Sequence, residues 1–96
     1  MKITLTKDFQ KWFGDLRDRK ARYRIQARID RLEIGGFGDV KGIGDGVSEM
    51  RIDHGPGYRL YYTRRGEELV VLLCGGDKGS QVRDIELAKK LVKGLA

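Results

Sequence analysis

The most constraining feature of this sequence is an uninterrupted apolar run at residues 69–74. Successive side chains of a strand point to opposite faces of a sheet, so a strand that is apolar on both faces needs both faces covered. Residues 47–53 and 58–65 predict two earlier strands, and residues 68–75 predict the third, which contains the apolar run. The turns between them are short and glycine-containing, which favours an antiparallel meander. We expect the apolar strand to lie centrally, beside a parallel N-terminal strand.

Two amphipathic helices are predicted before the meander. Residues 1–5 alternate between polar and apolar and predict a short strand, after which Thr6 can cap a helix. From Phe9 onward, the apolar side chains of that helix recur at i, i+3, i+4 and i+7. Asp18 can cap a second helix that runs to about Glu33, where two glycines follow. A short polar turn joins the two helices, so we expect a helical hairpin.

The rest of the chain predicts a linker and one more helix. Residues 35–46 contain six glycines in twelve positions and predict the linker. Residues 80–95 predict the last helix, with Ser80 as its cap. We therefore expect one α+β domain over residues 1–96: an N-terminal strand, a helical hairpin, an antiparallel β-meander and a C-terminal helix. A chain of this size forms one thin core, so a functional site is expected on a surface face or in a shallow groove.

Charge and composition exclude several classes of function. Lys and Arg number 20 against 14 Asp and Glu, which gives a net charge of +6 and favours a polyanionic partner, either nucleic acid or an acidic protein. The single cysteine, Cys74, cannot form an internal disulfide, and no Cys/His cluster predicts zinc. The glycine spacing matches neither a Walker loop nor a dinucleotide fingerprint, so we expect no cofactor and no metal. The N-terminus is not typical of a signal peptide and the longest apolar run is far too short to span a membrane, so we expect a cytoplasmic protein without a membrane partner.

Strand alternation places two arginines together. If the apolar side chains of both strands meet the helices, Arg51 lies opposite or diagonal to Arg59, with Glu49 and Tyr61 nearby. Adjacent guanidinium groups repel unless carboxylates such as Glu49 and Asp53 neutralise them. An anion between them would relieve the repulsion and gain bidentate hydrogen bonds. A neutralised pair and an anion site are both open readings.

The loop that opens the last helix could supply a further cation. Lys78 lies between the central strand and that helix, where free backbone N–H groups attract anions; an ordinary capped turn is the alternative. Arg51, Arg59 and Lys78 around one concave face would suit a scissile phosphate. Metal-free RNA cleavage needs a base for the 2′-hydroxyl, cations for the phosphorane and an acid for the 5′-oxygen. We expect His54 to be an exposed turn residue without a catalytic role.

The second predicted helix is crowded with arginines on its polar side, including Arg24 and Arg28. Such a face is either solvated or binds RNA phosphate or an acidic partner. Both interpretations remain open at the level of sequence.

Four ordered segments resemble a known family. They are Gly-Asp-Val-Lys-Gly at 38–42, Val-Ser-Glu-Met-Arg-Ile at 47–52, Gly-Pro-Gly-Tyr-Arg-Leu-Tyr-Tyr at 55–62 and Leu-Leu-Cys-Gly-Gly-Asp-Lys-Gly-Ser-Gln at 72–81. The set resembles the phage-derived, HigB-like killer proteins of type II toxin–antitoxin modules, which belong to the RelE/ParE toxin superfamily. The resemblance spans essentially the whole chain.

The resemblance implies a RelE-like, microbial-RNase-type fold and a toxin that cleaves mRNA in the ribosomal A site. It implies Arg51, Arg59 and Lys78 as the functional cations, and Tyr61 would then stack on a base or donate a proton. Lys41 matches another basic position; with Gln81, Arg24 and Arg28 it forms the expected contacts to RNA and ribosome. Expected partners are an antitoxin of helix-turn-helix type, the ribosome with its mRNA, and operator DNA through the antitoxin complex. Many relatives carry a tyrosine or histidine near the C-terminus, and this chain has neither after Tyr62.

Two other functions fit the same sequence. The superfamily includes gyrase inhibitors without RNase chemistry, so a protein-binding toxin is the first alternative. The second is a non-catalytic basic module that binds RNA or an acidic protein. Only Tyr61 is predicted as an aromatic on the arginine face, which is a thin platform for base stacking.

Overall fold

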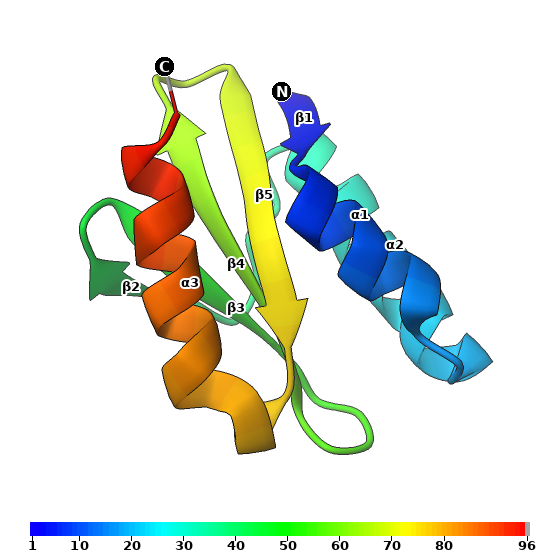
Figure 1. Ribbon diagram of the computed structural model, residues 1–96. Helices are drawn as coiled ribbons and strands as arrows, with labels where there is room; N and C mark the ends of the chain where they lie inside the picture. Colours follow the sequence, from blue (N-terminus) through cyan, green and yellow to red (C-terminus); the bar gives the residue numbers. More distant parts are fainter. Residues whose placement is uncertain (96) are drawn as a thin grey trace.

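A computed structural model describes residues 1–95 as a five-stranded sheet with helices on both faces (Figure 1). The elements are β1 (Lys2–Leu5), α1 (Lys7–Asp15), α2 (Arg19–Glu33), β2 (Val40–Gly44), β3 (Val47–Ile52), β4 (Tyr58–Arg65), β5 (Leu69–Gly76), the 3-10 turn η1 (Lys78–Ser80) and α3 (Gln81–Lys93). The predicted α+β class is confirmed. Within residues 1–95, no helix is both long enough and apolar enough to cross a bilayer.

The sheet has the strand order β1-β5-β4-β3-β2. Strand β5 pairs with β1 in parallel and with β4 antiparallel, so it is flanked on both sides. It is buried from Val70 through Gly76. The prediction of a central apolar strand beside a parallel N-terminal strand is therefore confirmed.

The predicted linker contains a strand, which is a correction to the sequence interpretation. Residues 40–44 form β2 and pair antiparallel with β3 at the edge of the sheet. The hairpin turns through Asp45 and Gly46, whose φ angles of 57° and 77° are both left-handed. An Asp-Gly pair favours this type of two-residue turn, so these two residues were the sequence feature that could have predicted the β2–β3 hairpin. The high glycine content of residues 35–46 argued against a strand in this segment, because glycine is depleted in strands.

The helices form two layers on opposite faces of the sheet (Figure 1). One core lies beneath α1 and α2; it includes Phe9, Ile25 and Leu32 of the helices and Met50, Leu60 and Tyr62 of the sheet. The other lies beneath α3; it includes Tyr61, Val71, Leu73, Cys74 and Ala88. The two cores divide the alternating residues of β3, β4 and β5 between the faces, except at Leu73 and Cys74, which share the α3 side because the β4–β5 register shifts there.

Two glycines at the end of β5 allow both layers to approach the sheet closely. A Cβ atom on Gly75 would collide with the Trp12 ring of α1, and one on Gly76 would collide with the Asp84 carboxylate of α3. Neighbouring strand residues point to opposite faces, so one pair of glycines serves both helical layers. Close backbone approach is a common reason for glycine inside a strand.

The helix caps were predicted in part. Thr6 accepts a hydrogen bond from the Phe9 N–H at 3.0 Å, and Asp18 accepts one from the Ala21 N–H at 3.1 Å, so both predicted caps are confirmed. Ser80 precedes α3 but its side chain caps none of the α3 N–H groups, which is a correction. The Asp77 carboxylate caps the preceding turn η1 instead.

Candidate functional site

Arg51 and Arg59 lie directly opposite each other on β3 and β4, as strand alternation predicted. They line a shallow groove of about 390 Å³ at the end of these strands, together with Asp39, Asp53 and Gly57. The side chain of Arg51 is 43% exposed and that of Arg59 is 13% exposed. One arginine is therefore open to solvent and the other is largely enclosed.

Each arginine has its own carboxylate, so the neutralised reading is realised in this structure. Arg51 Nη2 contacts Asp39 Oδ1 at 2.8 Å, and this hydrogen bond raises the pKa of Arg51. Arg59 Nε lies 3.8 Å from Glu49 Oε1. The expected partner Asp53 lines the groove but forms no ion pair among the described residues. The groove is consequently less positive than the two arginines alone would make it.

Asp39 is a site residue that the sequence did not predict as the partner of Arg51. Its carbonyl accepts a hydrogen bond from the Arg51 N–H at 3.0 Å, which continues the β2–β3 ladder by one residue. Reading residues 35–46 as a linker concealed this pairing. The Asp45-Gly46 turn alone would have placed Val40 opposite Arg51; an irregularity of β2 between Gly42 and Gly44 shifts the pairing by one residue and brings Asp39 there instead.

Lys78 lies near Arg59 across Gly57 but does not line the arginine groove; it lines a separate hollow at the start of α3. A Cβ atom on Gly57 would lie 3.5 Å from the Lys78 Cβ and 3.6 Å from Arg59 Nη1. Two of the backbone donors of this loop are already used, because the Asp77 carboxylate accepts from the N–H groups of Gly79 at 2.8 Å and Ser80 at 3.2 Å. The capped-turn alternative is therefore the one observed, and Lys78 contributes a side-chain charge only.

Tyr61 does not lie where its predicted role would require it. It is fully buried beneath α3 and donates a hydrogen bond from its hydroxyl to Glu49 Oε2 at 3.0 Å. Burial, and next the hydrogen bond to Glu49, raise the pKa of Tyr61 above its usual value. A side chain in this position neither stacks on a base nor gives up a proton readily. The predicted stacking or donating role is corrected because α3 covers this part of the sheet.

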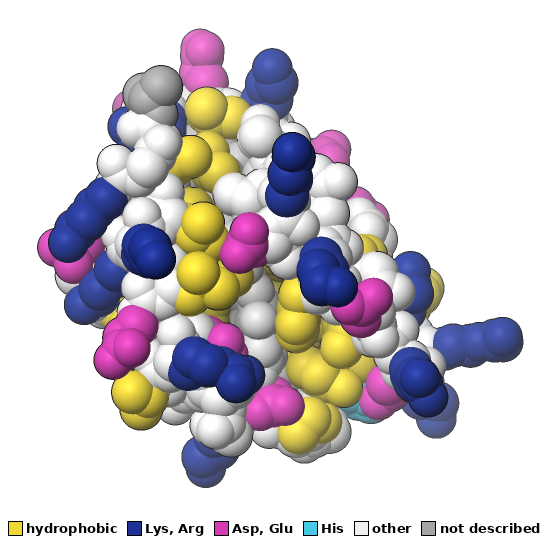
Figure 2. All heavy atoms as spheres, in the orientation of Figure 1, with side chains coloured by type: hydrophobic (Ala, Val, Ile, Leu, Met, Phe, Trp, Pro, Cys, Tyr) yellow, Lys and Arg dark blue, Asp and Glu magenta, His cyan; other side chains and the backbone are white. Residues whose placement is uncertain are grey.

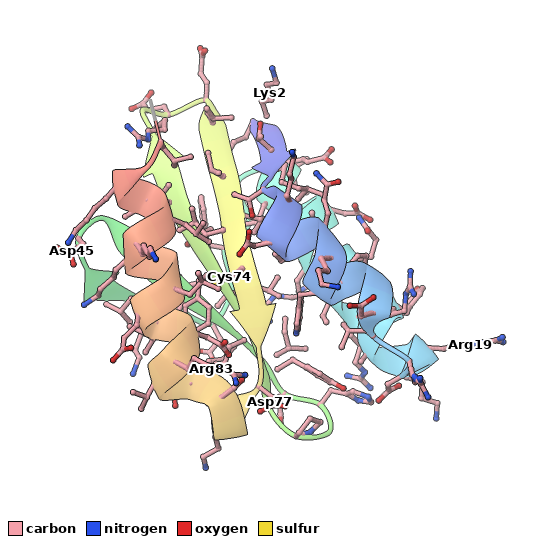
Figure 3. The ribbon with its side chains drawn as sticks, in the orientation of Figure 1. Lys2, Arg19, Asp45, Cys74, Asp77 and Arg83 are labelled. Atoms are coloured by element: carbon pink, nitrogen blue, oxygen red, sulfur yellow. The ribbon has the colours of Figure 1, made fainter. Side chains whose placement is uncertain are left out.

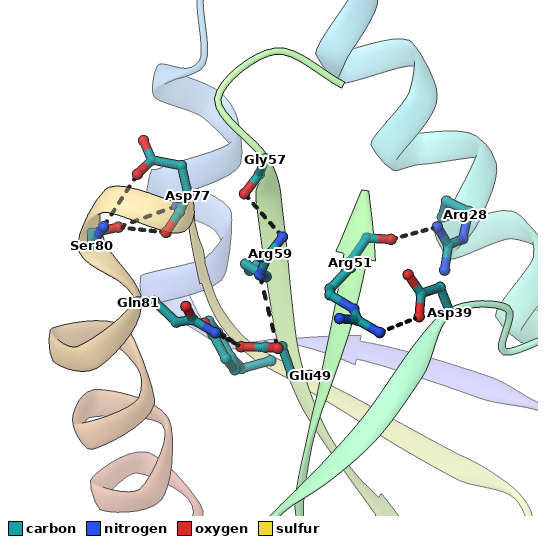
Figure 4. Close-up of polar contacts among 10 residues, drawn as sticks. Arg28, Asp39, Glu49, Arg51, Gly57, Arg59, Asp77, Ser80 and Gln81 are labelled. Carbon is teal, nitrogen blue, oxygen red and sulfur yellow. Dashed lines mark hydrogen bonds and ion pairs between the residues drawn. The ribbon is translucent and has the colours of Figure 1, made fainter. Parts of the chain in front are cut away.

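Gln81 and Arg28 also bind their own chain instead of being free for RNA. Gln81 Nε2 donates to Glu49 Oε2 at 2.8 Å. Arg28 donates to the carbonyl oxygens of Arg51 at 2.8 Å and Phe37 at 3.3 Å, and burial lowers its pKa. Arg28 of α2 thus holds the backbone beside the groove in place through these carbonyl groups (Figure 4).

Lys41 and Arg24 remain exposed, at two separate places. Lys41 lies on edge strand β2 opposite Glu49. Arg24 borders a shallow hollow on α2 with Arg19, Lys20 and Tyr23, and the Tyr23 side chain is 78% exposed. Arg19 points away from the body of the protein (Figure 3). On the face seen in Figure 2, cations and carboxylates are interspersed and form no single continuous basic patch.

His54 is held more firmly than a plain exposed turn residue would be. Its Nε2 lies 3.1 Å from Asp18 Oδ2, and its side chain is 19% exposed. The ring stacks on Tyr58 with 6.5 Å between ring centroids. This contact ties the β3–β4 turn to the start of α2. The expectation of plain exposure is corrected, and His54 lines no part of the arginine groove.

Cys74 faces the core beneath α3 (Figure 3), and burial raises the pKa of its thiol to about 12. The thiolate is the reactive form of cysteine, so the native protein is expected to react with iodoacetamide far more slowly than the denatured chain does at pH 8. Mass spectrometry of timed samples measures this difference. Equal rates with and without denaturant would contradict the burial of Cys74.

Among residues 1–95, no group of three or more His, Cys, Asp or Glu side chains is arranged to hold a metal ion.

Comparison with known proteins gives two matches that cover the groove. The phage-derived, Gp49-like protein family matches residues 11–93, which include both arginines and Lys78. An uncharacterised protein of Haemophilus influenzae is 48% identical over 95 residues, which are 99% of this chain and 94% of that protein. The similarity to this relative therefore extends over nearly the full length of both chains.

Proposed function

This chain belongs to the family of phage-derived, Gp49-like proteins, a family associated with the toxins of toxin–antitoxin modules, and we propose that it is a type II toxin that cleaves mRNA on the ribosome. The observation that carries the proposal is the pair of facing guanidinium groups, Arg51 and Arg59, in one open groove. Two such groups can bind the two free oxygens of a phosphodiester. The RelE/ParE assignment and the microbial-RNase-type fold are part of this proposal.

The cations have separate tasks in this mechanism. Arg51 is exposed and binds the scissile phosphate in exchange for its contact with Asp39, and the enclosed Arg59 binds the same phosphate while it remains paired with Glu49. Lys78, whose side chain begins beside Gly57, would extend toward the groove and stabilise the charge that develops on the phosphorane. The nucleophile is the 2′-hydroxyl of the RNA itself: its oxygen forms a bond to phosphorus as the P–O5′ bond breaks, and the departing 5′-oxygen takes up a proton from water in the open groove.

Asp53 is our candidate for the general base. It lines the same groove and is exposed, whereas Glu49 is fully buried. An exposed carboxylate beside the bound phosphate can accept the 2′-proton, and a buried one without solvent access cannot reach it. Tyr61 is excluded from contact with the substrate in this conformation by its burial.

Contacts to the ribosome are proposed for the exposed cations away from the groove. Lys41 on β2 and Arg24 on α2 are free of ion pairs among the described residues, so they can bind RNA phosphates. A cognate antitoxin, of helix-turn-helix type by the family resemblance, would hold the toxin inactive in the cytoplasm. Operator DNA would be bound only through that complex.

The deciding experiment maps the 5′ ends of a reporter mRNA shortly after the protein is induced in a bacterial host without its antitoxin. We expect new ends confined to the translated frame, because cleavage requires the ribosome. The same reporter with its start codon removed is the control and should remain intact. New ends in the untranslated control would contradict ribosome dependence.

Growth arrest with intact mRNA would instead favour inhibition of DNA gyrase. One observation favours this second candidate: both groove arginines already have carboxylate partners. A surface that binds a protein does not need arginines without such partners. Induction of the DNA-damage response in the same culture would separate the gyrase target from the ribosome.

A further inference from the structure

Glu49 is a charged side chain with none of its surface exposed. It lies on β3, opposite Tyr61 of β4 and within reach of Gln81 at the start of α3. Its Oε2 atom accepts hydrogen bonds from the Tyr61 hydroxyl at 3.0 Å and from Gln81 Nε2 at 2.8 Å. One carboxylate oxygen is therefore fixed by two donors from two different elements.

The other oxygen, Oε1, faces Arg59. The Oε1–Nε distance is 3.8 Å, and both atoms are buried and have no hydrogen-bond partner. On its other side, Arg59 Nη1 donates to the Gly57 carbonyl at 3.3 Å. The guanidinium of Arg59 is thus held between the Glu49 carboxylate and the Gly57 backbone (Figure 4).

A buried ion pair of this kind is a poor means of stabilising a fold. Removing both charges from water costs more than an apolar pair of similar size would, and the 3.8 Å gap leaves that cost incompletely compensated. The Tyr61 hydroxyl stays protonated because its pKa is raised, so it remains a donor to Glu49. The arrangement is explained better by the direction it imposes on Arg59.

We propose that Glu49 is a positioning residue: anchored by Tyr61 and Gln81, its carboxylate aims the Arg59 guanidinium at the phosphate groove. Gln81, which the sequence suggested as an RNA contact, acts through Glu49 instead. The docking of α3 is thereby linked to the anion site on β4. This inference rests on the proposed function only in taking Arg59 as an anion-binding group.

Electrostatics makes the inference sharply testable. If Glu49 were a bystander, replacing it by glutamine would remove a negative charge beside the groove and tighten the binding of an anion. If Glu49 aims Arg59, the same replacement weakens binding, because a misdirected donor loses its hydrogen bond. The two readings predict effects of opposite sign.

The experiment measures two quantities on Glu49→Gln, Gln81→Leu and the control Glu67→Gln. The first is the affinity for a 2′-O-methyl RNA oligonucleotide, which binds but is not cleaved by 2′-hydroxyl attack. The second is the Arg59 Nε–Hε resonance in a ¹⁵N-labelled sample. Gln81→Leu changes no charge, and Glu67 is exposed in the β4–β5 turn, so its replacement matches the charge change of Glu49→Gln away from Arg59.

We expect Glu49→Gln to weaken oligonucleotide binding about tenfold and to shift or broaden the Arg59 resonance. Gln81→Leu should also weaken binding and should also shift or broaden this resonance. Glu67→Gln should change neither. Tighter binding by Glu49→Gln, or an unchanged Arg59 resonance in both test variants, would overturn the inference. If the wild-type protein binds no oligonucleotide and cleaves no mRNA, the proposed function fails, and the Arg59 resonance alone then decides on positioning.

Discussion

Replacement of Arg59 by lysine is expected to abolish growth arrest and to slow mRNA cleavage by about 10²–10³-fold, the cost of losing one well-placed donor at a developing oxyanion. Lysine retains a positive charge next to Glu49 but lacks the planar fork that binds two phosphate oxygens. The fold should therefore survive while the site fails. Cleavage is measured by primer extension on a reporter mRNA, and folding by thermal melting.

Lysine is preferred to alanine at this position for a structural reason. Arg59→Ala would leave the fully buried Glu49 carboxylate without its cation, and breaking a buried pair costs about 3–5 kcal/mol. Loss of toxicity would then be confused with unfolding. Arg65→Ala is the matched control, because Arg65 ends the same strand and is exposed. Full toxicity of Arg59→Lys would remove Arg59 from the proposed mechanism.

Replacement of Gly75 or Gly76 by alanine is expected to lower the free energy of unfolding by about 1–3 kcal/mol each, as overpacking does in well-packed cores. The new methyl group would meet the Trp12 ring in the first variant, and the Asp84 carboxylate and Ser80 hydroxyl in the second. Both collisions occur where a helix is packed on the end of β5. Chemical denaturation gives the change directly.

Gly42→Ala provides the comparison for the glycine variants. Gly42 is also a strand glycine, but nothing lies within 4 Å of the Cβ it would gain, and its φ is not left-handed. Its replacement should leave stability almost unchanged. Destabilisation of Gly42→Ala equal to that of Gly75→Ala would mean that strand propensity, and not the close approach of Trp12, sets the cost.

Local patterns were sufficient for much of the fold. The period-two alternation of two strands placed Arg51 and Arg59 on one face, opposite or diagonal to each other, because a shift of one residue would expose the apolar face; the structure shows them directly opposite. Thr6 and Asp18 were found as caps because a cap acts within three residues along the chain. The glycine-rich segment that contains β2 was misread, since its strand depends on pairing with β3 and not on its own composition.

The sequence by itself determined which side chains share a face of the sheet, and hence that two guanidinium groups meet there. Only the tertiary structure decided what covers that face. The docking of α3 buries Glu49 and Tyr61 and brings in Gln81, while the pairing of β2 supplies Asp39 to Arg51. Arg28 reaches the Arg51 carbonyl across 23 residues of sequence. Periodicity along a strand specifies orientation, whereas burial and charge partners depend on elements distant in the chain, so no local pattern encodes them.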